Sequence, residues 1–131
     1  MTDFNILRKR YSEVLCGRGH SGKRTADCIL RSDERTEQRL AQLDTRIEKA
    51  ITSNEPGIVN ATLKGILDIS TSFSQNNSRF YHDENIKNKI FNALNALEKV
   101  YNDTIAPQGN WWYWEIGIPL SLNSIFTLMY D

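Results

Sequence analysis

The three tryptophans of the chain fall within four consecutive positions, Trp111, Trp112 and Trp114, and Tyr113 completes the run. A helix or strand that packs against one core places apolar residues at a period of 3.6 or 2, so four adjacent rings cannot all face the same core. An indole offers a flat apolar face and one N–H donor, which suits the C–H face of a sugar ring as well as a protein interface. The run therefore indicates either a sugar-binding wall or a docking site for another protein.

The rings of this run are expected to have different roles. Trp114 precedes Ile118 and Leu122 at helical spacing, which places it on a buried stripe and favours an anchoring role. Adjacent indoles rarely both find space in a core, so Trp111 and Trp112 are expected to line the rim of a cleft. The alternative, in which all three indoles anchor the loop to the next helix, remains open.

The other candidate acids and bases have ordinary structural explanations. Glu115 lies near a predicted helix start, where the helix dipole favours a carboxylate. His82 is expected to cap the N-terminus of another helix. His20 lies in the basic, glycine-rich loop 17–24, which lacks the spacing and the preceding strand of a phosphate-binding loop. No catalytic residue is assigned from these features.

Composition excludes several classes of function. Cys16 and Cys28 form no CxxC pair, and with two histidines in the chain no metal-ligand set is visible, so no metal or cofactor is expected. Whether these two cysteines pair is left open. Basic and acidic residues balance at 16 each, which argues against a dedicated nucleic-acid partner. The basic surplus in residues 1–24 is interpreted as a solvated helix face and a basic loop, although it could steer an anionic ligand.

Apolar spacing predicts an all-α chain of antiparallel helical hairpins, with no strand alternation. Its 131 residues suit a single domain, 1–131. No apolar run is long enough to span a membrane, and Met1 is not followed by a signal peptide, so no membrane partner is expected. A first helix is predicted that is capped by Thr2 or Asp3 and stopped at Gly17, and further helices are predicted over about 33–52, about 58–73, 82 or 83 to 101, and 118–130.

The last predicted helix is apolar on nearly every side, and it carries Pro119 in its first turn. A helix of this kind is normally buried all round. Either it is the central helix of a compact bundle, or it is covered by further helices or by a second copy of the chain.

Residues 110–123, Asn-Trp-Trp-Tyr-Trp-Glu-Ile-Gly-Ile-Pro-Leu-Ser-Leu-Asn, resemble the hallmark segment of the N-terminal α-domain in polysaccharide lyase family 8. This family includes hyaluronate, chondroitin AC and xanthan lyases. The opening residues 7–17 and the segment 81–84, Tyr-His-Asp-Glu, also resemble that domain. One departure is Tyr113, which stands where the family often has Asp.

The resemblance implies part of an incomplete α/α toroid, whose enzymes cleave uronic-acid polymers by β-elimination. Their catalytic Asn, His, Tyr and Arg lie C-terminal to the Asn-Trp-Trp segment and have no counterpart here, so this chain alone is expected to be inactive. It would supply the aromatic wall, in which Trp111 and Trp112 stack on sugar rings and Asn110 bonds to hydroxyls. The implied partners are an acidic polysaccharide (hyaluronan, chondroitin or xanthan type) and the remainder of a lyase chain, and the parent protein would be secreted or held at the cell surface. The alternative is a non-catalytic helical module that uses the tryptophans to bind another protein.

Overall fold

The computed structural model describes residues 3–15, 26–75, 77–101 and 112–129, and these residues form helices joined by turns, with no strand among them. The predicted all-α class is confirmed. The elements are α1 (Asp3–Leu15), α2 (Ala26–Ser53), α3 (Pro56–Phe73), α4 (Glu84–Leu97), the π-helical turn η1 (Tyr113–Gly117) and α5 (Ile118–Met129).

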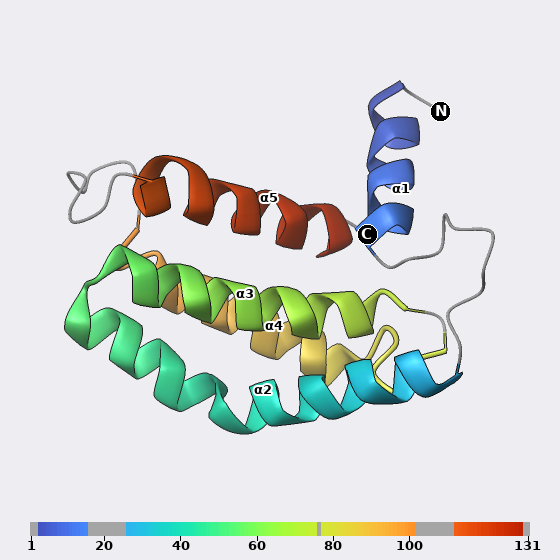
Figure 1. Cartoon of the computed structure of the whole chain (residues 1–131), viewed down its shortest axis with the longest axis horizontal. Coiled ribbons are helices and arrows are strands. Elements are labelled where there is room, and N and C mark those ends of the chain that lie inside the picture. The colour runs from blue at the N-terminus through green and yellow to red at the C-terminus, as the bar shows by residue number, and fades with distance from the viewer. Residues whose placement is uncertain (1–2, 16–25, 76, 102–111, 130–131) are drawn as a thin grey trace.

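Helices α2 and α3 form an antiparallel hairpin, as the sequence predicts (Figure 1). Asn54 ends α2 in the left-handed region at φ 54°, a conformation that asparagine tolerates better than most residues. Pro56 follows at the first position of α3, where its missing N–H costs no helical hydrogen bond. The chain therefore reverses within two residues, and the two helices pack along their length.

The central helix is α3, which lies between α2 and α5 and in front of α4 in Figure 1. Its Leu63, Ile66 and Ile69 are almost completely buried and belong to one hydrophobic core cluster with Ile90 of α4 and Ile125 of α5. Burial of these aliphatic side chains supplies the main driving force for the bundle, at roughly 25 cal/mol for each Å² of apolar surface removed from water.

Helix α5 does not lie at the centre of the bundle, so the alternative that the last helix is the central helix of a compact bundle is wrong. One face of α5, with Ile118 and Ile125, packs on α3 and is fully buried. The opposite face leaves Leu120 57% exposed and Phe126 54% exposed. The residues that the structure describes thus leave an apolar helix face uncovered.

The start of α2 differs from the prediction, and the structure decides between the two residues that were predicted to begin α4. Helix α2 begins at Ala26 instead of about residue 33. Asp33 lies within the helix, where its buried carboxylate accepts hydrogen bonds from the Ser78 hydroxyl and the Arg79 N–H. Asp83, not His82, caps α4, and its side chain accepts from the N–H groups of the second and third residues that follow. His82 instead adopts a left-handed φ of 52° and stacks against the rings of Phe73 and Tyr81.

No helix among the described residues has both the length and the apolar character needed to cross a membrane.

Candidate functional site

The tryptophan segment enters α5 through a π-helical turn, Tyr113–Gly117. The N–H of Ile118 donates to the carbonyl of Tyr113, five residues earlier. Pro119 follows at the second position of α5, where its ring would conflict with a carbonyl four residues back in a regular helix. The wider π turn relieves this conflict, and such turns occur often at functional sites.

Trp112 directly precedes this turn and is exposed, with 42% of its surface accessible. Its ring meets Tyr113 edge-on at a centroid distance of 5.4 Å and an interplanar angle of 83°. The other close neighbour is Gly117, where an added Cβ would lie 2.8 Å from Cζ3 of the indole. The ring is therefore held against the backbone of the next turn while a large part of it remains open to solvent.

Tyr113 joins the π turn to the first turn of α3. Its ring lies against Gly57, where an added Cβ would be 3.4 Å from Cε2 of the tyrosine. The side chain is half-buried in this position. A tyrosine therefore fills a packing site at α3 that the shorter side chain of an aspartate would not fill.

Trp114 contacts Tyr101, the last described residue before the tryptophan segment. Their rings meet edge-on at 4.9 Å, and the Tyr101 hydroxyl donates to the backbone carbonyl of Trp114 at 2.9 Å. Burial raises the pKa of the Tyr101 hydroxyl above its ordinary value of 10.0. These contacts are those of an anchor, as the spacing predicts, although the indole is half-buried and not fully enclosed.

A buried polar contact lies beneath Trp112. The hydroxyl of Ser121 on α5 donates to Oδ1 of Asn60 on α3 at 3.1 Å, and both side chains are buried. The amide nitrogen of Asn60 would be 3.3 Å from a Cβ at Gly117, so it lies against the same glycine as the indole. This hydrogen bond fixes α5 to α3 and so fixes the surface on which Trp112 rests.

The structure describes one of the three predicted sugar-binding residues. Asn110 and Trp111 lie outside the described residues, and Trp112 is exposed directly before the π turn. Glu115 is exposed on this turn, near the start of the helical segment where the sequence places it. Sequence reasoning missed Gly57, Gly117, Asn60 and Ser121, which hold the turn in place.

The remaining candidates form no catalytic group in the described part of the chain. His82 and Tyr81 stack on each other near the end of α3, away from Trp112, which lies near its start. No three His, Cys, Asp or Glu side chains of the described residues come together in a way that could hold a metal ion. Cys28 is exposed on α2, while Cys16 lies outside the described residues.

Comparison with known proteins agrees with the all-helical fold and identifies the family. The chain is 29% identical to a xanthan lyase of Bacillus sp. (strain GL1) over 140 aligned positions, which cover 98% of this chain and 15% of the lyase. Residues 26–131 match the family described as polysaccharide lyase family 8, N terminal alpha-helical domain. Since that match covers most of the 131 residues, the chain belongs to polysaccharide lyase family 8, in its N-terminal α-helical domain.

Proposed function

We propose that this chain supplies the aromatic sugar-binding wall of a lyase that cleaves uronic-acid-containing polysaccharide by β-elimination. The observation that carries the proposal is the exposed indole of Trp112, held over Gly117 beside a π turn. Family membership and the xanthan lyase relative support an acidic polysaccharide as the ligand. Asn110 and Trp111 precede Trp112 directly and would extend the wall by a second indole and an amide.

The fixed position of Trp112 suits this role. A sugar ring that stacks on an indole gains apolar contact on its C–H face without needing a charged partner. Because the ring already rests on Gly117 and against Tyr113, little conformational freedom is lost when a sugar binds. A preorganised wall of this kind orients a flexible polymer for reaction elsewhere in the enzyme.

The chemistry itself is assigned to residues that this chain does not contain. The chain spans about 15% of the length of the xanthan lyase that it matches. We propose that its antiparallel hairpins are the first part of an α/α toroid, that the parent protein is secreted or held at the cell surface, and that the chain alone has no lyase activity.

The remainder of a lyase chain would cover the exposed apolar face of α5. A groove of about 400 Å³ lies between α3, α4 and α5, with Phe91 and Leu94 on one wall and Leu122 and Phe126 on the other. Phe126 is more than half exposed, so a further helix packed here would remove a large apolar surface from water. A second copy of the chain is the alternative occupant.

The second candidate function is a non-catalytic module that binds another protein through Trp112. The exposed apolar side chains beside the turn, Ile116 and Leu120, favour it because protein interfaces are rich in such aromatic and aliphatic contacts.

A titration with oligosaccharides separates the two functions. Fragments of xanthan, hyaluronan and chondroitin are added while tryptophan fluorescence is recorded, with a neutral glucan fragment as the control. The proposal predicts a saturable change with at least one acidic fragment and no absorbance from an unsaturated uronate product. An unchanged emission with all three acidic fragments would favour the protein-binding module.

A further inference from the structure

Basic residues of α2 gather on one side of the helix. Positions 35, 39, 42, 46 and 49 are spaced alternately by four and three residues, so their side chains share one face. At a rise of about 1.5 Å per residue, this row is about 21 Å long. The row, the basic stripe of α2, holds cations and one amide but no acid: Arg35, Arg39, Gln42, Arg46 and Lys49.

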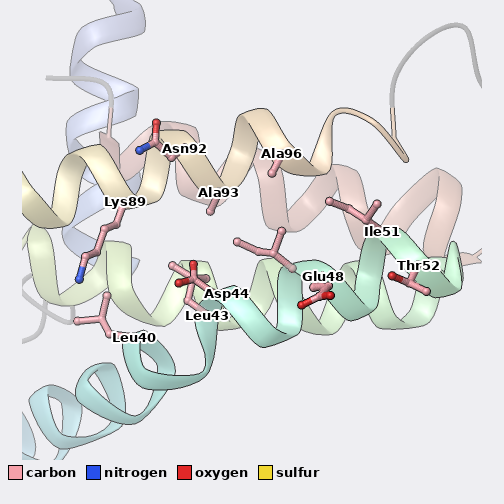
Figure 2. A pocket seen from close by; sticks show the side chains of 11 residues that line it. Leu40, Leu43, Asp44, Glu48, Ile51, Thr52, Lys89, Asn92, Ala93 and Ala96 are labelled. Carbon is pink, nitrogen blue, oxygen red and sulfur yellow. The ribbon is translucent and has the colours of Figure 1, made fainter.

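The exposed acidic residues that the structure describes on α2 lie on other sides of the helix. Asp44 and Glu48 line a groove of about 550 Å³ between α2 and α4, and Lys89 of α4 reaches into the same groove (Figure 2). Glu37 forms an ion pair of 2.6 Å with an arginine that follows α3. Glu34 precedes the stripe by one residue and is therefore turned about 100° away from its first member. The basic stripe is thus separated from the acids of its own helix.

Two arginines of the stripe lie across α3 at Gly65. A Cβ added at this glycine would be 3.6 Å from Cδ of Arg39 and 3.9 Å from Nη1 of Arg46, so both side chains extend over the neighbouring helix. Both are half-buried, while Arg35 and Lys49 at the two ends of the stripe are exposed. Because the inner arginines already rest against the protein, they lose less side-chain freedom when an anion binds them.

The charges beside the stripe leave it with a positive surface. Arg39 pairs with Asp68 of α3 at 3.3 Å. Within the described part of the chain Arg46 forms no ion pair, and neither does the exposed Lys64, which lies one residue before the glycine and adds a further cation. Like charges one turn apart, such as Arg35 and Arg39, destabilise a helix slightly, so anions along the stripe would be favourable.

The Lys49 end of the stripe lies toward the candidate sugar-binding wall. Helices α2 and α3 are antiparallel, so the last turns of α2 lie beside the first turns of α3 (Figure 1). Tyr113 packs against Gly57 in the first turn of α3, and Trp112 directly precedes Tyr113. A linear polymer that is longer than the aromatic wall therefore meets a row of cations beside it.

We propose that the basic stripe is a further binding site for the acidic polysaccharide, in which its arginines and Lys49 hold successive carboxylates of the polymer. This inference rests on the proposed function, since it takes a uronate polymer as the ligand of the aromatic wall. Arginine binds a carboxylate through two parallel N–H···O bonds, which a neutral sugar cannot accept in the same way. Stacking on Trp112 binds the sugar rings and the stripe binds their charge, so the two sites together select an acidic polymer and reinforce each other.

The test measures the affinity of the full chain for a xanthan oligosaccharide, and for the same oligosaccharide with its carboxylates reduced to alcohols, by titration calorimetry. The wild-type chain is expected to bind the acidic form about tenfold more tightly than the reduced form. Arg46→Glu and Lys49→Glu are each expected to remove most of this preference and to leave the affinity for the reduced form unchanged. The preference should also shrink as NaCl rises from about 50 mM to about 300 mM, because salt screens exposed charges.

Lys9→Glu is the matched control, since it changes the net charge equally at an exposed site on α1, outside the stripe. It is expected to retain the preference for the acidic form. Lys49 is exposed, so circular dichroism should show unchanged helix content in Lys49→Glu. This variant therefore tests the stripe whether or not the half-buried Arg46 tolerates substitution.

Trp112→Ala separates this inference from the proposed function. It is expected to weaken the binding of both forms equally and to keep the preference, whereas equal binding of both forms by the wild-type chain would overturn the stripe and leave the aromatic wall standing. A preference that persists in Arg46→Glu and Lys49→Glu, or that Lys9→Glu also abolishes, would overturn the stripe as well. So would single-stranded DNA that binds more tightly than the acidic oligosaccharide and loses its affinity in Lys49→Glu, since that result assigns the stripe to a nucleic acid. A chain that binds neither form would overturn both proposals.

Discussion

The indole of Trp112 lies so close over Gly117 that a Cβ at this glycine would come within 2.8 Å of ring carbon Cζ3. The two residues belong to one wide helical turn, Tyr113–Gly117 and the residue before it. Only hydrogen at position 117 lets the ring rest on the backbone. The exposed aromatic surface of the candidate site therefore depends on a glycine five residues further along the chain.

Gly117→Ala is expected to displace the indole and to weaken binding of an acidic oligosaccharide severalfold. Trp112 is partly exposed and can swing away, while alanine favours the helix by about 1 kcal/mol relative to glycine. The free energy of unfolding should therefore change by no more than about 1 kcal/mol. Near-ultraviolet circular dichroism and calorimetric titration measure the two effects.

Gly65→Ala is the matched control for this substitution. Gly65 lies in α3, and an added Cβ would be 3.6 Å from the Arg39 side chain, an ordinary contact. Gly65→Ala should leave the near-ultraviolet circular dichroism and the affinity for the oligosaccharide unchanged. Equal affinity in the wild-type and Gly117→Ala chains would show that the position of the indole is irrelevant to the sugar.

Trp114→Ala is expected to lower the free energy of unfolding by about 2 kcal/mol, because a half-buried ring and its edge contact with Tyr101 are lost. Trp112→Ala, which removes a more exposed ring, should cost less than about 1 kcal/mol. Urea denaturation of both variants measures the difference. An equal decrease in the free energy of unfolding for the two variants would mean that both indoles pack in the core.

Tyr101 is expected to make the fold sensitive to alkali. Burial raises the pKa of its hydroxyl in the folded chain above the ordinary 10.0, so the unfolded chain releases this proton first as the pH rises. The stability that the protonated Tyr101 hydroxyl contributes to the fold is thus fully present below pH 10.0, and it is lost as the pH rises through the pKa of this hydroxyl in the folded chain. Urea midpoints between about pH 9 and about pH 11 should fall less steeply for Tyr101→Phe than for the wild-type chain. The same slope in both proteins would assign the alkaline sensitivity to other groups.

Asp33→Ala is expected to destabilise the bundle by about 2 to 3 kcal/mol, since it leaves the buried Ser78 hydroxyl and the Arg79 N–H without their acceptor. The effect should be confined to stability, because Asp33 bonds to the segment after α3 while Trp112 lies near the start of that helix. Thermal unfolding and oligosaccharide titration of the same variant measure both properties. A loss of affinity in an otherwise folded Asp33→Ala chain would contradict this separation.

Helical periodicity predicts most of the fold. The apolar spacing gives α3 over about 58–73, against Pro56–Phe73 in the structure. The predicted start of α2, at about residue 33, was wrong by seven residues, since α2 begins at Ala26 and Asp33 lies within it. Its hydrogen-bond partners, Ser78 and Arg79, follow 45 and 46 residues later, and no local pattern reveals such a contact.

The candidate site is predictable in its residue types and less so in its geometry. Four adjacent aromatics indicate that some rings must face solvent, and Trp112 does. The π turn was not predicted, although Pro119 after Gly117 was the signal that could have indicated it. The contact of Tyr113 with Gly57 depends on how η1 packs against α3, which only the folded chain determines.

The central claim, that Trp112 stacks on a sugar ring, is tested most directly by the affinity of Trp112→Ala and Trp112→Phe for a xanthan oligosaccharide, measured by titration calorimetry. The account predicts that alanine lowers the affinity about tenfold, equivalent to about 1.4 kcal/mol, because the flat apolar face is lost. Phenylalanine, which keeps such a face, should remain within about threefold of the wild-type chain. An affinity of Trp112→Ala equal to that of the wild-type chain would contradict the claim.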